Sequence, residues 1–331
     1  MIERAPTLDD LRAHRLQLYA AAAWRKAGRP VPAELAEDEL FASIRVLGVL
    51  SLLERIRDAC DGPILLIKGY EVAVRYPDPA LRPFGDVDLL VPEPENVSHA
   101  LRSKGFEPVG YPDDHYDSLH HLRPLRLPSL PITIEIHRRP EWVRWSAAPP
   151  TEQLLAHAAP SRSGVDGILA PSPAQHALIV TAHSWSDLPL RRIADLIDAR
   201  ALAAEALPGE VDEWAERWDL DGLWRFTERL RSAVLDDGPP PLGMRIWGRS
   251  ALATRDATVL EQHERRLLAP FSVLSVRRAF REAAAQAVAE LTPAGGETWR
   301  AKLARTALAV RHAFVRRSQH DARWNRHDGE R

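Results

Sequence analysis

Cysteine and lysine are both rare in this chain of 331 residues. The single cysteine, Cys60, cannot form a disulfide within the chain, which excludes a small secreted fold held together by disulfides and leads us to expect a cytoplasmic protein. Only four of the 44 basic residues are lysines, and the others are arginines. Because lysine is so scarce, Lys68, which stands directly before a glycine at the end of an apolar run, is a candidate functional residue.

The chain also lacks a strong net charge and long apolar segments. Its formal net charge is −2 at pH 7, so no overall positive field indicates nucleic acid as a partner. No apolar run approaches the roughly 18 residues that a membrane-spanning helix needs. The first ten residues carry three acidic side chains in place of the apolar stretch of a signal peptide. We therefore expect neither a membrane anchor nor secretion.

Helical patterns dominate both ends of the chain. Residues 7–27 are predicted to form a helix that opens with the capping-box pair Thr7 and Asp10. Residues 34–58 carry apolar side chains at helical spacing and predict a second helix. From about residue 150 onward the pattern is helical again, and its tryptophans at helical spacing indicate core packing.

Strand patterns lie between these helical regions. Residues 64–67 predict a short buried strand, and residues 119–127 and 132–137 predict an antiparallel pair. We therefore expect an α+β fold, with a small mixed β-sheet and flanking helices followed by an all-helical half. The expected divisions are N-terminal helices at 1–60, a sheet core at 61–147, a helical domain at 148–318 and a flexible tail at 319–331.

Two carboxylates project from one face of a buried strand at residues 86–91. Successive side chains of a strand point to opposite faces, so Asp86 and Asp88 share one face while the apolar residues between and after them share the other. An Asp-x-Asp triplet on an exposed edge strand is often only solvated. The apolar run Leu89 to Val91 indicates a strand that is buried on both faces instead.

Glu135 is a third acid candidate. Residues 132–137 alternate strictly, which places Glu135 and His137 on the face opposite the isoleucines. Carboxylates about 4 Å apart repel each other by roughly 1 to 4 kcal/mol at effective dielectric constants between water and a protein surface. A cluster of Asp86, Asp88 and Glu135 would therefore need a cation, and oxygen ligands suit Mg²⁺ or Mn²⁺. On this reasoning Asp88→Asn should leave the fold intact or slightly more stable.

These motifs resemble a known family. The chain is similar to the nucleotidyltransferase superfamily, and closely to its bacterial group of uncharacterised nucleotidyltransferases. The resemblance lies in Lys68-Gly69 after an apolar strand, then Gly85-Asp86-Val87-Asp88, then Glu135 in an alternating strand. The resemblance spans roughly residues 40–200. It implies an enzyme that moves a nucleoside monophosphate from an NTP to an acceptor and releases pyrophosphate. Asp86, Asp88 and Glu135 would then be the catalytic and metal-binding residues, with Glu135 also a candidate proton acceptor. Most of the superfamily has Gly-Ser or Gly-Gly where this chain has Lys68-Gly69.

Four residues are expected to bind the nucleotide, namely Lys68, Gly69, Arg82 and Gly85. Gly69 either offers backbone N–H groups to phosphate at a helix start or merely allows a tight turn. Arg82 is either a bidentate phosphate clamp or a counter-ion for the two aspartates.

Several histidines are candidate accessory residues. His120 and His121 are consecutive in a predicted strand and should point to opposite faces. No spacing of the histidines matches a zinc motif. We therefore expect only His121 or His137 to face the site. The family that the chain resembles carries a histidine and then an aspartate on later helices, here His183 and Asp195. A structural contact between helices is the favoured interpretation of both.

Other classes of function stay open. The fold could serve a non-catalytic nucleotide-sensing or partner-binding protein, or the Asp-x-Asp motif could belong to a metal-dependent glycosyltransferase, which does not require Glu135 on a neighbouring strand. The acceptor is equally open, with small molecules, peptides and proteins as candidates. The sequence carries no signal for the preferred base or the oligomeric state.

Overall fold

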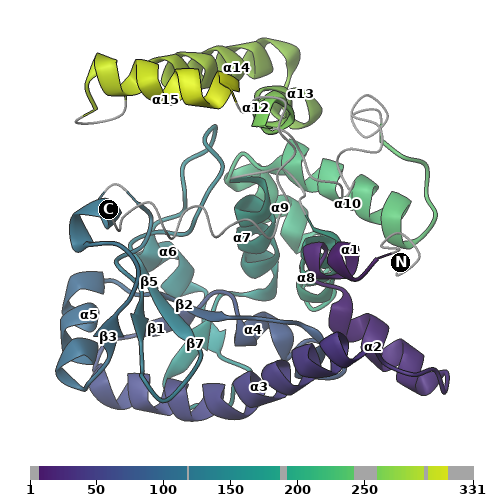
Figure 1. Cartoon of the computed structure of the whole chain (residues 1–331), viewed down its shortest axis with the longest axis vertical. Helices are drawn as coiled ribbons and strands as arrows, with labels where there is room; N and C mark the ends of the chain where they lie inside the picture. The colour runs from purple at the N-terminus through teal and green to yellow at the C-terminus, as the bar shows by residue number, and fades with distance from the viewer. Residues whose placement is uncertain (1–6, 118, 187–191, 242–258, 294–296, 312–331) are drawn as a thin grey trace.

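The computed structural model describes residues 7–117, 119–186, 192–241, 259–293 and 297–311. Its centre is a mixed sheet of seven strands in the order β3-β4-β5-β2-β1-β7-β6 (Figure 1). The central strands β2 and β5 are parallel, whereas β1 runs antiparallel to β2. The strands are β1 (Ile64–Leu66), β2 (Asp86–Leu90), β3 (Glu107–Pro108), β4 (Leu125–Arg126), β5 (Thr133–His137), β6 (Ala159–Pro160) and β7 (Ile168–Ala170).

Helices cover both faces of the sheet (Figure 1). The N-terminal part contributes α1 (Leu8–Ala13), α2 (Gln17–Lys26), α3 (Ala33–Ala59), α4 (Tyr70–Ala73) and α5 (Pro94–Ser103). The rest contributes α6 (Thr151–Ala156), α7 (Pro173–Ser186), α8 (Ile193–Ala203), α9 (Glu210–Arg217), α10 (Asp221–Leu235), α12 (Val259–Leu268), α13 (Pro270–Val273), α14 (Val276–Leu291) and α15 (Trp299–Arg311). Two 3₁₀ turns lie at Pro79–Leu81 and Asp113–Tyr116. The predicted α+β class, with a mixed sheet followed by a helical half, is confirmed.

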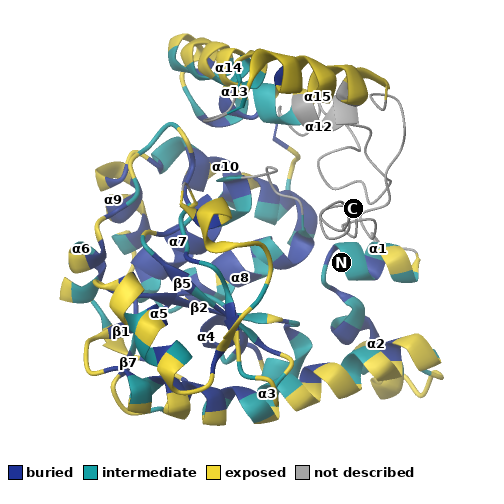
Figure 2. Ribbon diagram, turned by 60° about the vertical axis from the view of Figure 1, so that its left-hand side comes forward, coloured by how far each residue is buried: buried dark blue, intermediate teal, exposed yellow. Residues whose placement is uncertain are grey.

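Strand alternation sorts the sheet residues into two cores. Val87 and Leu89 of β2 pack with Ile134 of β5 and with α3 and α5 on one face. On the other face, Leu65 of β1 and Leu90 of β2 pack against α7 to α10. The alternation predicted for residues 86–91 and 132–137 is therefore confirmed. Figure 2 shows the buried residues concentrated between the sheet and these helices, whereas α14 and α15 are largely exposed.

The sheet extends past residue 147, into the part expected to be helical. Strand β7 pairs parallel with β1, and β6 pairs antiparallel with β7. Both strands are only two or three residues long, too short for alternation to mark them in the sequence. The predicted strand at 119–127 is mostly irregular, and only Leu125–Arg126 pairs with β5 as a strand.

The predicted helix at 7–27 is broken in the middle. Thr7 and Asp10 form the expected capping box, but α1 ends at Ala13 and α2 begins at Gln17. Arg15, between them, has a φ of 56°, in the left-handed region. The predicted helix at 34–58 is confirmed as α3.

No helix in the described part of the chain is long and apolar enough to cross a membrane. The predicted tail at 319–331 lies outside the described residues.

Candidate active site

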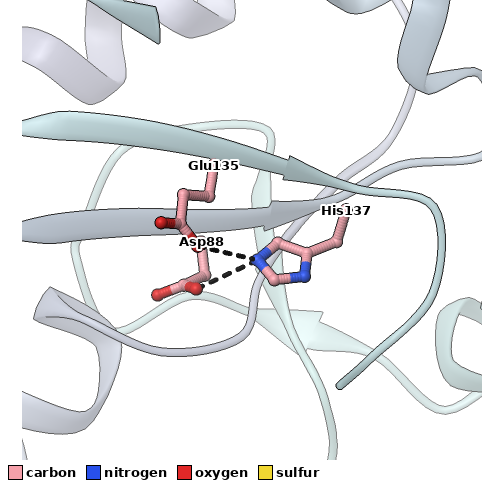
Figure 3. A group of neighbouring side chains, drawn as sticks. All are labelled: Asp88, Glu135 and His137. Atoms are coloured by element: carbon pink, nitrogen blue, oxygen red, sulfur yellow. Dashed lines mark hydrogen bonds and ion pairs between the residues drawn. The ribbon is translucent and has the colours of Figure 1, made fainter. Parts of the chain in front are cut away.

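The acidic residues lie on the sheet face that α7 to α10 cover. Asp88 of β2 and Glu135 of β5 are direct partners in the parallel pairing, and Asp86 pairs with Thr133 two positions earlier. Figure 3 shows Asp88, Glu135 and His137 extending from the two strands toward one another. One ligand atom from each of these three residues lies within 4.8 Å of the others. The structure thus brings Asp88 and Glu135 together and adds His137 to them, while Asp86, on the same face, is outside this group.

Lys68 is the counter-ion of the acidic group. Its Nζ lies 2.9 Å from Asp88 Oδ1, and both side chains are buried, with 15% and 1% exposure. Burial alone would lower the pKa of Lys68, but the charges of Asp88, Asp86 and Glu135 outweigh it and raise that pKa above its ordinary value. The pKa of Asp88 is lowered despite burial, because Lys68 and His137 favour its charged form. The chain itself therefore supplies a cation for Asp88, which removes the basis for expecting Asp88→Asn to relieve repulsion.

The pKa of Glu135 is shifted in the direction opposite to that of Asp88. Burial, together with the charges of Asp88 and Asp86, raises the pKa of Glu135 to about 8. Without a bound cation, this carboxyl therefore holds its proton at neutral pH.

The donor set fits a divalent cation. Asp88 Oδ2 is buried and has no hydrogen-bond partner among the described residues, although the other oxygen, Oδ1, accepts from His137 Nε2 at 3.0 Å. Nδ1 of His137 is also buried without a partner there, so the proton on Nε2 could move to Nδ1 and free Nε2 as a ligand. Two carboxylates suit Mg²⁺ or Mn²⁺, and the imidazole favours Mn²⁺ of the two.

Arg82 is engaged by a helix of the second half. Its guanidinium makes two hydrogen bonds to Asp198 of α8, at 2.8 and 2.9 Å, and donates to the carbonyl of Gly69 at 3.0 Å. Tyr76 also donates to Asp198. Arg82 is thus the counter-ion of Asp198, and it ties the loop before β2 to α8.

Gly69 has a steric role. Its φ is 63°, and a Cβ at this position would lie 2.5 Å from the carbonyl oxygen of Asp86. Only glycine allows this close approach of the two backbones. Helix α4, which begins directly after Gly69, is a single turn at Tyr70–Ala73. Gly85 is exposed, and its carbonyl accepts hydrogen bonds from the backbone N–H and hydroxyl of Thr133.

The expectation that His120 and His121 point to opposite faces is wrong. Their ring centroids are 4.8 Å apart, and they lie 5.3 and 5.6 Å from the ring of His137. The alternation rule fails because residues 119–120 form a bend and His121 makes only an isolated bridge to His137. His121 donates from Nδ1 to the carbonyl of Leu122. Three histidines therefore gather beside the acidic group.

His183 reaches the site from α7. Its Nδ1 lies 2.5 Å from Glu141 Oε2 and 3.5 Å from Lys68 Nζ. These neighbours belong to the loops after β5 and β1, and His183 also acts electrostatically on Asp195 of α8, so the interpretation of His183 and Asp195 as a contact between helices stays a prediction. Ser186 donates to the other oxygen of Glu141, which holds the carboxylate in place.

Sequence reasoning missed Glu141. The pKa of Glu141 is lowered despite burial, mainly because its carboxylate accepts a hydrogen bond from His183. Its only sequence signal is that it is the sole acid between His137 and Pro150, in an irregular segment where no periodicity applies.

Asp195 is not brought to the metal-binding group. It lies at the start of α8 and is half-buried. Burial raises its pKa, and its electrostatic neighbours are Arg192, Arg15, Asp198 and His183.

A family model described as uncharacterised nucleotidyltransferase matches residues 6–236. This match covers the whole sheet, the acidic group and the helices through α10. Searches of curated proteins and of solved structures find no match.

Proposed function

Because this chain belongs to the uncharacterised nucleotidyltransferase family, we propose that it transfers a nucleoside monophosphate from an NTP to an acceptor. In this reaction a bond forms between the acceptor oxygen and the α-phosphorus, and the bond from that phosphorus to pyrophosphate breaks. The observation that carries the proposal is the pairing of Asp88 with Glu135 on adjacent parallel strands, together with a buried Asp88 oxygen that has no hydrogen-bond partner among the described residues.

Asp88, Glu135 and His137 would hold the cation, and Asp86 lies on the same face to assist them. A bound Mg²⁺ or Mn²⁺ would neutralise charge on the triphosphate and on the attacking oxygen. Lys68 then faces both the carboxylates and the incoming phosphate. Its positive charge offsets the repulsion between the two.

The acceptor hydroxyl must lose a proton, and we assign that proton to Nε2 of His183. The Nδ1–H group of His183 donates to Glu141 Oε2, which fixes the tautomer in which Nε2 of His183 carries the lone pair. Glu141 thus acts as a positioning residue. Glu141→Gln should lower turnover and shift the acidic limb of the pH profile, where the base gains its proton, without changing NTP affinity. A purely structural Glu141 would change stability and leave the pH profile alone.

The function is tested by incubating the full chain with each NTP and Mg²⁺ or Mn²⁺, in the presence of a cell lysate as the source of acceptors. Pyrophosphate release and the masses of labelled products are measured. Glu135→Gln should abolish release while the fold is retained. Glu107→Gln, which removes an exposed carboxylate of β3 in the same sheet, is the matched control and should behave as wild type. Equal pyrophosphate release by the Glu135 variant and wild type would refute the assignment.

The ion pair between Lys68 and Asp88 favours a second candidate, a protein that binds nucleotide without turnover. With Asp88 already neutralised by a lysine, nucleotide binding does not require a metal at Asp88. This candidate predicts that NTP raises the melting temperature equally with and without Mg²⁺, and that no pyrophosphate appears. The transferase predicts a larger rise with Mg²⁺.

A further inference from the structure

A cavity of about 470 Å³ lies between the core of the chain and the helices α12 to α14. Trp145 and Ser186 line it on the side of the core, and Arg266 of α12 and Glu282 and Ala285 of α14 line it on the other side. Its volume is within the range of roughly 300–1,000 Å³ that is typical of small-molecule sites. Helices α12 to α14 lie outside residues 6–236, the part that the family model matches. The cavity is therefore completed by a part of the chain that the family match does not cover.

Hydrogen bonds hold the two sides of the cavity together. Arg278 of α14 donates to Asp219 Oδ1 and to the carbonyl oxygen of Trp145, each at 2.6 Å. Arg144, which precedes Trp145, donates to the side chain of Gln286 of α14. The wall that α14 supplies is thus fixed to the loop after β5.

The cavity reaches the residues to which we assign the acceptor proton. Ser186, in its wall, donates to Glu141 Oε1 at 2.5 Å, and the other oxygen of Glu141 lies 2.5 Å from His183 Nδ1. His183 and Ser186 are three residues apart on α7, so their side chains lie on the same face of that helix. A molecule in the cavity is therefore close to His183, which in turn lies 3.5 Å from Lys68 Nζ.

The charges on the walls of the cavity cancel. Two arginines and two glutamates line it, namely Arg144, Arg266, Glu282 and Glu290. Gln286 engages two of these four residues, because it accepts from Arg144 and donates to Glu290 at 2.9 Å. Walls with balanced charge give no net attraction to an anion or a cation, so a neutral ligand suits the cavity best.

Glu282 offers hydrogen-bond acceptors to such a ligand. Its side chain is half-buried and makes no hydrogen bond or ion pair with another residue in the described part of the chain. Its electrostatic neighbour is Arg278, whose guanidinium gives its hydrogen bonds to Asp219 and to the Trp145 carbonyl. A carboxylate accepts from two hydroxyl groups at once, and the half-buried indole of Trp145 presents an apolar ring to C–H groups. Both features fit a ring that carries neighbouring hydroxyl groups.

We propose that this cavity binds the acceptor, and that the acceptor is a small neutral molecule with neighbouring hydroxyl groups, a sugar or another polyol. The inference rests on the proposed function. One hydroxyl oxygen of the polyol forms the bond to the α-phosphorus and gives its proton to Nε2 of His183. Pyrophosphate leaves with the electron pair of the bond that breaks.

The first test separates acceptors by their chemistry, with the full chain, an NTP and Mg²⁺ or Mn²⁺. A cell lysate is divided by ultrafiltration, and the small-molecule filtrate is passed through mixed cation- and anion-exchange resin. This neutral filtrate should support pyrophosphate release and yield a labelled product. Periodate cleaves neighbouring hydroxyl groups, so treating the filtrate with periodate, and removing the excess before NTP is added, should abolish release.

The second test changes the cavity from α14. Ala285→Trp places an indole in the cavity, and Ala284→Trp, at the neighbouring exposed position that does not line it, is the matched control. Glu282→Gln should raise the KM for the neutral filtrate about tenfold, the loss expected for a hydrogen bond to a charged group, and Ala285→Trp should raise it at least as much. The control should behave as wild type. The KM for NTP should stay unchanged in all three variants, and their melting temperatures should not fall.

Pyrophosphate release that only the macromolecular fraction supports, or only solutes that the resin retains, would overturn the inference and leave the proposed function standing. The same conclusion would follow from acceptor activity that survives periodate, or from an Ala285→Trp protein that behaves as its control. No release with any fraction would instead refute the proposed function, and the inference with it.

Discussion

Asp88→Asn should strongly destabilise the protein in the absence of metal. The substitution keeps the shape of the side chain but removes the negative charge 2.9 Å from the Lys68 ammonium. At an effective dielectric constant of about 20, that separation corresponds to an attraction of roughly 6 kcal/mol, part of which offsets the cost of burying the two charges. Removing one member of a buried pair typically costs about 3–5 kcal/mol, because the other charge stays buried alone. We expect a loss in that range.

The assay is denaturant unfolding at pH 7 with a chelator, for wild type, Asp88→Asn, Lys68→Met and the double variant. Each single variant should lose about 3–5 kcal/mol, and the double variant should lose less than their sum, since neither charge is then left unpaired. Asp113→Asn is the comparison for an exposed pair. The carboxylate of Asp113 is 60% exposed beside Arg102, so its loss should change stability by at most about 1 kcal/mol.

A more stable Asp88→Asn protein would refute this reasoning. It would mean that repulsion among the carboxylates outweighs the attraction of Lys68, as the sequence pattern alone suggests. Additive effects in the double variant would likewise show that the two side chains do not interact strongly in solution.

Three further predictions concern single residues. The pKa of Glu135 is raised to about 8, so the folded state keeps a proton that the unfolded state loses above about pH 4.5. The free energy of unfolding should therefore fall by up to roughly 1.4 kcal/mol per pH unit between these two values. Glu135→Gln should remove this slope in denaturation curves measured from pH 5 to 8. Burial lowers the pKa of His176 to about 3, and its Nε2 donates to the Ile67 carbonyl. Its contribution is complete above about pH 6.5 and should be lost as the pH falls toward 3, a loss that His176→Gln should reduce in acid unfolding curves. Gly69→Ala should lower the free energy of unfolding by about 1–3 kcal/mol, since alanine disfavours the positive φ and its Cβ would meet the Asp86 carbonyl. Thermal or denaturant unfolding measures this loss, and an unchanged midpoint would show that the turn can relax.

The sequence by itself determined the direction of side chains in regular strands and helices, where the apolar pattern repeats every two residues or every three to four. Strand alternation correctly placed Asp88 and Glu135 on the same face, opposite the isoleucines of β5, and the spacing of apolar residues located α3. These inferences succeed because side-chain direction in a regular strand or helix depends only on position along the chain. The same rule failed for His120 and His121, where the backbone bends.

The tertiary structure alone decided which charges pair. Arg82 lies four residues before Asp86 in the chain, yet its carboxylate partner is Asp198, 116 residues away on α8. Lys68 pairs with Asp88 because the end of β1 lies antiparallel beside β2, and Lys68 lies beside His183 because α7 packs on the open face of these two strands. The break at Arg15 likewise depends on His14 docking against the start of α8. A buried charge takes the opposite charge that packing brings within reach, and sequence spacing holds no information about helices that meet across a sheet.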